Sequence, residues 1–501
     1  MGRSVTPSYV LTLKLNTDTS DESFLNKRFF LSCKIHNKLV SHVKKQAAKM
    51  QSDHRYRELL KERRILSGHN DPRSKHMRSQ INEQLKQIRL GYGLSEYQLH
   101  GYVQTQQHIY AGYLGSQTCQ KIASSVWKSA DAFLFGKGKQ IHYQKSMYYN
   151  ILYGAKTNST YMVYDKIAKT VRIGRYGIPV SVDYDDLYVC YALQDKIKYC
   201  QIIRKPFANG YHYYLQLIME GVPPKKHVTA DGRVGIDIGT SSVAVSAENE
   251  VLLARLGDHT YGHSAQIRRL QHAMDRSKRA MNPDKFNADG TYNRNDHSKW
   301  IISKSYKKLR MKKRMLERKQ AASLKQSHEM LANDIIAMGN DVYTEEMNFS
   351  ALQRRKKQTT KSRNGKYHRK GRFGRSLKSY APAMLISIVD RKLSYQGFEL
   401  HKVNTRTFRA SQYNHVTDEY VKKKLGNRSV QIGSHKVQRD LYSAFLLMNS
   451  DVELQHTDRQ LCMDTFHNFK ELHNRYMNQL VSQHKSGVAF PSCMGIKDFV
   501  A

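Results

Sequence analysis

The fold of the second half of the chain is decided by the stretch Arg233-Val234-Gly235-Ile236-Asp237-Ile238-Gly239-Thr240-Ser241-Ser242-Val243-Ala244-Val245. Its two apolar runs, separated at Gly239, predict two buried strands joined by a tight turn. Asp237 lies in the middle of the first run. An ionised carboxylate in a hydrophobic strand is costly unless a metal ion, another cation or strong hydrogen bonds compensate it. Asp237 is therefore a candidate site residue, the alternative being that it only caps the turn at Gly239.

Two more acids stand at the expected ends of secondary structure. Residues 340–348 predict a short strand that ends in acids, and residues 437–448 predict a helix with Asp440 near its start. Because Asp237, Glu345 and Asp440 are far apart in the sequence, only the tertiary fold can bring them together. Phosphodiester cleavage uses such carboxylates to hold two Mg²⁺ ions, which stabilise the attacking and leaving oxygens. Asp237 would bridge both ions, and Glu345 and Asp440 would each complete one.

The composition points to a polyanionic partner. The 501 residues include 83 Lys and Arg against 42 Asp and Glu, a formal net charge of +41. Such an excess favours contact with nucleic acid or an acidic membrane, because each neutralised phosphate releases counterions. With 40% hydrophobic residues the chain can fold into roughly two to four domains, which excludes disorder as its main state. No apolar stretch is long enough to cross a bilayer, so we expect a soluble, intracellular protein.

Basic residues gather in two segments on either side of Glu345. Residues 263–338 predict two helices around a loop at 282–295, and residues 351–389, which contain no acid, predict a mobile loop on a phosphate backbone. A solvated helix face would normally mix charges of both signs. The predicted nucleic-acid-binding residues are Lys307, Lys308, Arg310, Lys312, Lys313 and Arg314 in the helix, and Arg354, Arg355, Lys356, Lys357, Arg369, Lys370, Arg372 and Arg375 in the loop.

The first part of the chain mixes strands and helices. Apolar residues alternate at 9–15, which predicts a strand, and recur at helical spacing from 22 to 50 among Lys and Arg. Further helices are predicted at 55–65 and 81–89, and further strands within 148–164 and at 211–217. The sequence Gly221-Val222-Pro223-Pro224 then interrupts the pattern and predicts a domain boundary.

Three motifs carry a resemblance to a known family. They are Gly235-Ile236-Asp237-Ile238-Gly239-Thr240, Val342-Tyr343-Thr344-Glu345-Glu346-Met347-Asn348 and Arg439-Asp440-Leu441-Tyr442-Ser443-Ala444. In order and spacing they resemble the RuvC motifs of the TnpB-type RNA-guided endonucleases of insertion sequences, relatives of the type V CRISPR effectors. Glu345 fits the second motif better than Glu346. The resemblance covers about residues 229–448, and the N-terminal half is similar only in outline.

The resemblance implies a fold and an activity. Residues 229–448 would form an α/β ribonuclease-H-like (RuvC) nuclease domain with Asp237, Glu345 and Asp440 as catalytic, Mg²⁺-binding residues. Residues 1–228 would form a β-barrel-like wedge domain and a helical recognition domain, and residues 449–501 read as a polar C-terminal tail. The implied enzyme is a Mg²⁺-dependent endodeoxyribonuclease of the prokaryotic cytoplasm, associated with the nucleoid. Its partners would be guide RNA and double-stranded target DNA with a short flanking motif, and not a membrane.

The chain departs from the family pattern in two ways. The family usually carries a four-cysteine zinc ribbon between the second and third motifs, but residues 404–437 contain no cysteine, so zinc is not expected there. This interval would be a cysteine-free remnant of the ribbon. His401, His415 and His435 are interpreted as phosphate-facing or surface residues, and Cys462, His467 and His473 as no better a metal site. Tyr442 stands where the family more often has Asn, which leaves Asp451, Asp458 and Asp464 as alternatives to Asp440.

Three other functions fit part of the pattern. The chain could be an RNA-guided DNA-binding repressor whose nuclease is inactive, although all three acids are present. It could be a sugar-kinase or actin-like ATPase, because residues 235–242 also resemble the first phosphate motif of that superfamily, although no second glycine-rich phosphate loop follows. It could also be a transposase that cuts DNA without RNA.

Overall fold

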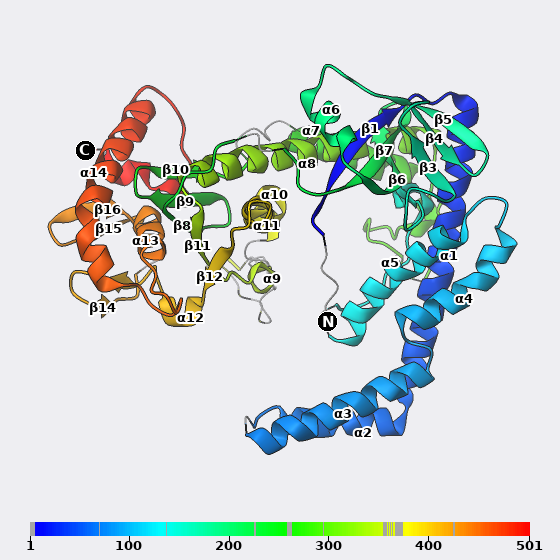
Figure 1. Cartoon of the computed structure of the whole chain (residues 1–501), viewed down its shortest axis with the longest axis horizontal. Coiled ribbons are helices and arrows are strands. Elements are labelled where there is room, and N and C mark those ends of the chain that lie inside the picture. Colours follow the sequence, from blue (N-terminus) through cyan, green and yellow to red (C-terminus); the bar gives the residue numbers. More distant parts are fainter. Residues whose placement is uncertain are drawn as a thin grey trace. The chain divides into compact units, whose positions relative to one another are not determined.

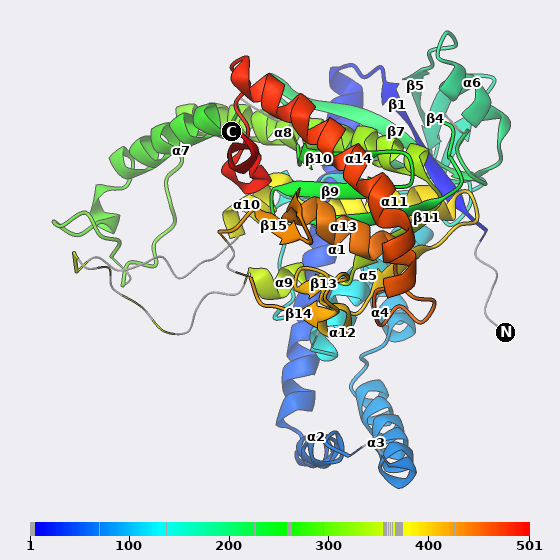
Figure 2. The same cartoon turned by 90° about the vertical axis from the view of Figure 1, so that its left-hand side faces the viewer.

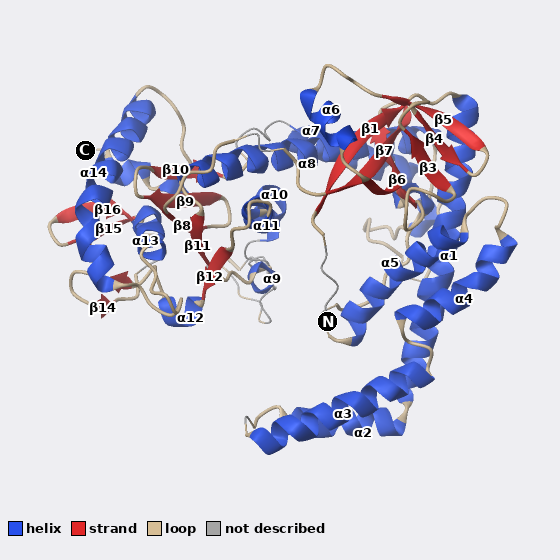
Figure 3. Cartoon of the chain, in the orientation of Figure 1, coloured by secondary structure: helices blue, strands red, loops and turns tan. Residues whose placement is uncertain are grey.

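The computed structural model describes residues 6–69, 71–136, 138–224, 227–257, 263–293, 295–353, 358, 360, 362, 364–365, 374–423 and 426–500. The chain divides into two units, Met1–Pro224 and Lys225–Ala501. Both units contain helices and strands (Figure 3). Among the described residues, no helix has the length and apolar character that a membrane span requires.

The first unit is built on an antiparallel sheet of seven strands (Figure 1). Its spatial order is β2-β6-β7-β1-β5-β4-β3, and β3 also contacts β6, so the sheet curls toward closure as a barrel-like sheet does. In β1 every second side chain from Tyr9 to Leu15 is buried, as the alternating sequence predicts. The strands are β1 (Ser8–Leu15), β2 (Ile151–Tyr153), β3 (Met162–Asp165), β4 (Thr170–Ile173), β5 (Tyr176–Ser181), β6 (Ile197–Phe207) and β7 (Gly210–Glu220).

Helices make up the rest of the first unit, and the predicted basic helix is its longest. Asp18 and Asp21 begin this helix with a capping box in which each side chain accepts from the other residue's backbone N–H. Asp53 and Asp71 cap the next two helices in the same position. The helices are α1 (Thr19–Ser52), α2 (His54–Leu66), α3 (Pro72–Gly91), α4 (Glu96–Ile109), α5 (Ser116–Leu134) and α6 (Leu187–Gln194), with a 3₁₀ turn, η1 (Ser146–Tyr148).

The second unit is built on a five-stranded mixed sheet in the order β10-β9-β8-β11-β12. The first three strands along the chain pair antiparallel, and β11 and β12 join them in parallel. The predicted pair of strands around Gly239 is confirmed as β8 and β9. The strands are β8 (Arg233–Ile238), β9 (Ser242–Ala247), β10 (Val251–Arg255), β11 (Asp341–Glu345) and β12 (Leu400–Val403).

Helices cover both faces of this sheet (Figure 2). On one face, Val234 and Ile236 pack with α8 (Lys304–Met338) and α11 (Pro382–Ser394). On the other face, Ala244 and Leu253 pack with α13 (Arg439–Met448) and α14 (Arg459–Lys485). The interpretation of residues 449–501 as a polar tail is therefore wrong, because α14 buries Phe469 and other apolar residues against α13. Its polar composition belongs to the exposed face of an amphipathic helix.

The remaining elements of the second unit are short, except for α7 (His263–Ala280), which packs along α8. Residues 374–380 and 382–394 form helices, so the loop predicted over 351–389 is wrong from residue 374 onward. The other elements are η2 (Pro283–Lys285), α9 (Phe349–Leu352), α10 (Gly374–Tyr380), α12 (Thr405–Phe408), β13 (Tyr413–Asn414), β14 (Glu419–Tyr420), β15 (Ser429–Ile432), β16 (His435–Gln438), η3 (Ser492–Met494) and η4 (Ile496–Phe499).

Candidate active site

Two of the three predicted acids lie side by side on neighbouring strands. The parallel pairing of β8 with β11 places Thr344 opposite Ile236, and the Thr344 hydroxyl donates to the Ile236 carbonyl at 3.2 Å. Asp237 and Glu345 are the next residue on each strand. Because neighbouring residues in register point to the same face of a sheet, both carboxylates leave the same face.

The third acid reaches this face on a helix that lies very close to the sheet. Gly235 shares a face with Asp237, two residues on, and a Cβ at Gly235 would overlap the backbone O of Ala444 and the backbone N of Met448. The absence of a side chain at Gly235 thus lets α13 lie directly on β8. Asp440, in the first turn of α13, lies close enough to Asp237 to raise its pKa by charge repulsion.

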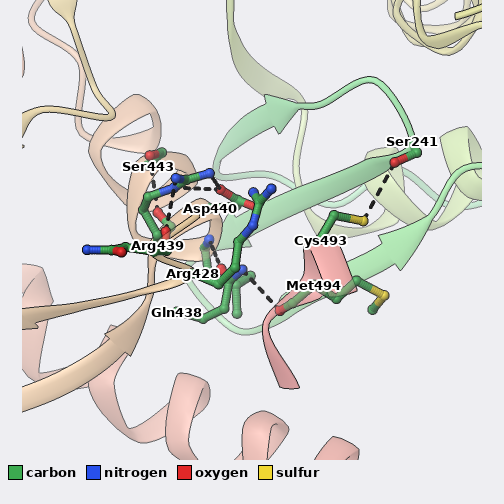
Figure 4. Close-up of polar contacts among 10 residues, drawn as sticks. Ser241, Arg428, Gln438, Arg439, Asp440, Ser443, Cys493 and Met494 are labelled. Carbon is green, nitrogen blue, oxygen red and sulfur yellow. Dashed lines mark hydrogen bonds and ion pairs between the residues drawn. The ribbon is translucent and has the colours of Figure 1, made fainter. Parts of the chain in front are cut away.

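The start of α13 is fixed by contacts with segments beyond the third motif (Figure 4). Gln438 caps the helix, because its side-chain oxygen accepts from the Leu441 N–H at 2.7 Å. The Gln438 amide group donates to the Met494 carbonyl, and its backbone N–H donates to Nε2 of His473 in α14 at 2.9 Å. An acid in the first turn also interacts favourably with the helix dipole. Asp440 is therefore held by the fold and does not move with a free loop.

Two arginines that the sequence did not single out contact Asp440. Arg439 donates from Nε and Nη2 to one carboxylate oxygen, at 3.1 and 2.9 Å, and Nη1 of Arg428 lies 3.7 Å from the other (Figure 4). Both guanidinium groups also lower the pKa of Asp237 by their charge, although less than the other causes raise it. The site thus holds three carboxylates and two arginines. The third motif contained Arg439, but nothing in the sequence linked Arg428 to it.

Burial and repulsion oppose ionisation of the two strand carboxylates. Burial, then the charge of Asp440, then that of Glu345 raise the pKa of Asp237 well above its usual range. Burial raises the pKa of Glu345 to about 7. Both side chains keep some accessible surface, yet protein atoms surround them densely enough to remove most of the solvation that a charge needs. Burial thus disfavours the charged form of both acids, and the neighbouring carboxylates add to this effect at Asp237.

The donor chemistry of the site suits a hard divalent cation, which binds oxygen ligands. A cation would also compensate the repulsion that raises the pKa of Asp237. The spacing is not that of a closed metal site, since no three His, Cys, Asp or Glu side chains among the described residues gather closely enough to hold a metal ion together. In particular, Asp440 is engaged by Arg439 and Arg428.

The raised pKa of Glu345 predicts a pH dependence of stability. A carboxyl whose folded-state pKa exceeds its unfolded value of 4.5 stabilises the fold below pH 4.5, and this contribution is lost as the pH rises toward about 7. In EDTA, the thermal midpoint of the wild type should therefore fall relative to that of Glu345→Gln between pH 4.5 and 7. Parallel midpoints of the two proteins across this range, measured by differential scanning fluorimetry, would contradict the burial of Glu345.

The acids that could replace these three have local roles or are exposed. Glu346 is exposed, so the structure favours Glu345 as the residue facing Asp237. Asp458 caps α14 by accepting from the Leu461 N–H, and Asp451 accepts from two backbone N–H groups of its own turn. Asp464 is exposed on α14 and accepts from Gln460. Each of these contacts is a local structural one.

The cysteine-free interval at 404–437 folds as two small hairpins, β13-β14 and β15-β16. The interpretation of His415 as a surface residue is wrong, because it is fully buried. The backbone N–H of His415 donates to the Tyr442 hydroxyl at 3.2 Å, and Nδ1 of His415 lies 2.8 Å from the same hydroxyl. Arg459 donates from Nε to the His415 carbonyl at 2.9 Å. Tyr442, the departure from the family pattern, thus fastens the first hairpin to the helix that carries Asp440.

Replacement of Tyr442 by Phe should destabilise the second unit by about 1–3 kcal/mol, because the buried His415 groups lose their partner. Tyr149→Phe is the matched control, since its buried hydroxyl has no hydrogen-bond partner among the described residues and its removal should be neutral or stabilising. Urea unfolding of both variants measures the difference. Equal stabilities would show that the Tyr442 hydroxyl does not hold the hairpin.

The predicted nucleic-acid-binding residues fall into three groups. In α8, Lys307, Lys308 and Lys312 are exposed and Arg310 is half-buried, whereas Lys313 pairs with Glu317 at 2.9 Å and Arg314 is largely buried. Arg314 is thus poorly placed to meet a phosphate. Arg375 lies in α10, but its side chain is outside the described residues. Also outside them are Arg354, Arg355, Lys356, Lys357, Arg369, Lys370 and Arg372.

Comparison with known proteins gives only distant similarities. No family model and no curated protein matches the chain. Among solved structures, it is similar to a chain of the Cas12f1–sgRNA–target DNA complex, with 10% identity over 89% of this chain and 99% of that one, at a TM-score of 0.42. It is also similar to a chain of a CRISPR–Cas12f ternary complex, with 13% identity over 86% and 82% of the two chains, at a TM-score of 0.25. Scores below 0.5 do not establish a common fold.

Proposed function

We propose that the chain is an RNA-guided DNA endonuclease with a RuvC-like site formed by Asp237, Glu345 and Asp440. The observation that carries the proposal is the placement of these acids, two on adjacent parallel strands and one on the helix that crosses them. The strand order, with three antiparallel strands followed by two parallel ones, is the arrangement expected of a ribonuclease-H-like sheet. A sheet of this kind hosts several activities, so the site must carry the function.

The proposed cofactor is Mg²⁺, which Asp237 and Glu345 would hold from the same face of the sheet, with Asp440, engaged in the structure by Arg439 and Arg428, as the predicted third ligand. When bound, it would stabilise the charge that develops on the oxygens of the phosphodiester. Asp237 and Glu345 would ionise more readily beside it, because a cation compensates the burial and repulsion that raise their pKa values. Arg439 and Arg428 would orient Asp440.

The proposed partners are a guide RNA and a double-stranded DNA target with a short flanking motif. The net charge of +41 supports a polyanionic partner. In the first unit, a hollow of about 650 Å³ between α2 and α3 is lined by Lys61, Arg63, Arg64 and Arg78, and no acid is among the described residues that line it. Such a surface suits a phosphate backbone, which is how a protein holds a nucleic acid whose sequence is read by base pairing.

The test is to express the protein together with its native flanking DNA and to sequence the RNA that remains after a high-salt wash. We expect one discrete RNA from that locus, and RNA-directed cleavage of matching DNA in Mg²⁺ but not in EDTA. Cleavage that survives ribonuclease treatment would indicate an unguided enzyme. Guided binding without cleavage would indicate the inactive repressor.

A further inference from the structure

The loop between α7 and α8 has a folded core of its own. Residues 281–293 and 295–303, here called the aromatic tip, lie between the two helices at the end of the hairpin that is away from the five-stranded sheet (Figure 2). Since α8 has 35 residues, the tip is about 50 Å along the helix from β11. It belongs to neither the carboxylate site nor the sheet that supports it.

Buried polar groups fix the shape of the aromatic tip. The Asn282 side chain, 6% exposed, donates to the carbonyls of Lys278 and Ile301 and accepts from the Ile301 N–H. The Lys285 ammonium, 3% exposed, donates to the Ser298 carbonyl at 2.8 Å and pairs with Asp296 at 3.1 Å. Burial of an amide and an ammonium is costly unless both groups form hydrogen bonds. Because these hydrogen bonds are present, the tip has one defined conformation.

Three aromatic rings meet on this frame. Phe286 and Tyr292 face each other across a tight hairpin, and both contact Trp300. The Tyr292 and Trp300 rings are nearly parallel, at 18°, with centroids 5.7 Å apart, which is offset stacking. Tyr292 nevertheless remains 46% exposed. An exposed ring that other rings already hold in place loses little entropy when a ligand stacks on it.

Positive charge lies against the rings that hold Tyr292. Lys278 is 3.4 Å from the centroid of the Trp300 ring, and the Arg279 guanidinium is 4.9 Å from that of Phe286. Lys299, next to Trp300 in the sequence, and Lys304, at the start of α8, are exposed. Of the acids in the tip, Asp296 is paired with Lys285, Asp289 accepts from Thr291, and Asp284 is exposed. An aromatic ring flanked by cations suits a base with its phosphates, because the base stacks and the phosphates meet the charges.

We propose that the aromatic tip binds an unpaired nucleobase, which stacks on Tyr292 while its phosphates contact Arg279, Lys299 and Lys304. The ligand class is single-stranded nucleic acid, RNA or DNA. A base inside a duplex cannot expose its face to the ring without leaving the stack. The inference goes beyond the proposed nuclease function and does not depend on the carboxylates.

The chain offers a specific probe of this site, because it contains only two tryptophans, Trp127 and Trp300. In the full-length Trp127→Phe protein, fluorescence reports on Trp300 alone. The Trp300 signal therefore distinguishes binding at the tip from binding at the many other basic surfaces, which would dominate a simple binding assay. The protein is titrated in EDTA with r(U)₁₂, (dT)₁₂, a 12-base-pair DNA duplex and polyphosphate. We expect that one or both of the single strands quench Trp300 and that the duplex and polyphosphate do not. The single strand that quenches at the lower concentration is the preferred ligand.

Substitution of Tyr292 tests the stacking itself. Stacking of a base on an aromatic ring contributes about 1–3 kcal/mol, so Tyr292→Ala should weaken the binding that quenches Trp300 by roughly 5- to 150-fold. Tyr292→Phe keeps the ring and should bind as the parent does. Equal quenching by duplex or polyphosphate, or unchanged binding by Tyr292→Ala, would overturn the proposal.

A measurement on the unsubstituted protein guards against misfolding of the variant. RNA containing 5-iodouridine should crosslink on irradiation to residues 281–303, as located by mass spectrometry. Crosslinks confined to other segments would also overturn the proposal. The titrations are done in EDTA and are therefore independent of the cleavage assay, which is done in Mg²⁺. Quenching of Trp300 without cleavage would count against the nuclease proposal alone. Cleavage without quenching would count against the aromatic tip alone.

Discussion

Asparagine at position 237 should abolish the proposed DNA cleavage while it stabilises the folded chain. Cleavage should fall by roughly three orders of magnitude or more, because the amide cannot supply the charge with which the Asp237 carboxylate would hold the proposed metal ion. Stability should rise in EDTA, because Asn cannot ionise and so escapes the burial and the repulsion from Asp440 and Glu345 that raise the pKa of Asp237. The thermal midpoint should increase by about 2–4 °C for each kcal/mol of repulsion removed.

The sign of the effect on stability can be checked by its pH dependence. A raised carboxyl pKa destabilises the folded state progressively as the pH rises above the unfolded value of 3.8, so the gap between Asp237→Asn and wild type should widen from pH 4 upward. Glu346→Gln is the matched control, because this neighbouring carboxylate is exposed and should change neither cleavage nor the thermal midpoint. An active Asp237→Asn enzyme would refute the site.

Alanine at position 235 should unfold or displace α13. The new Cβ would overlap backbone atoms of Ala444 and Met448, and backbone atoms cannot rotate away as a side chain can. We expect a loss of about 3 kcal/mol or more in the free energy of unfolding, beyond ordinary overpacking. Since α13 carries Asp440, any protein that still folds should also lose the proposed cleavage.

The matched control for this substitution is Gly177→Ala. Gly177 is also a strand glycine, in β5, and an added Cβ would meet no atom within 4 Å. Urea unfolding should show little change for Gly177→Ala and a large loss for Gly235→Ala. Similar stabilities of the two variants would mean that α13 does not lie as close to β8 as the contact at Gly235 requires.

The sequence predicted those helices and strands whose apolar residues repeat regularly along the chain. The strands around Gly239 and the acid at the start of α13 follow from apolar periodicity and from motif order, and all are found where they were expected. The sequence did not predict Arg428, because its contact with Asp440 depends on the hairpin at 429–438, which has no strong periodic signal. His415 was misinterpreted for a related reason, since burial of a polar residue depends on partners distant in the sequence, here Tyr442 and Arg459.

The position of α14 has a practical consequence for anyone who wishes to shorten this chain. The polar composition suggests that residues from 449 onward could be deleted. The deletion would, however, remove Phe469 and Leu472, which pack on the apolar residues of α13, and would expose a hydrophobic surface. It would also remove His473, which accepts the hydrogen bond at the start of the helix that carries Asp440. Truncated versions should therefore aggregate during expression, and a miniature of this protein has to be trimmed elsewhere.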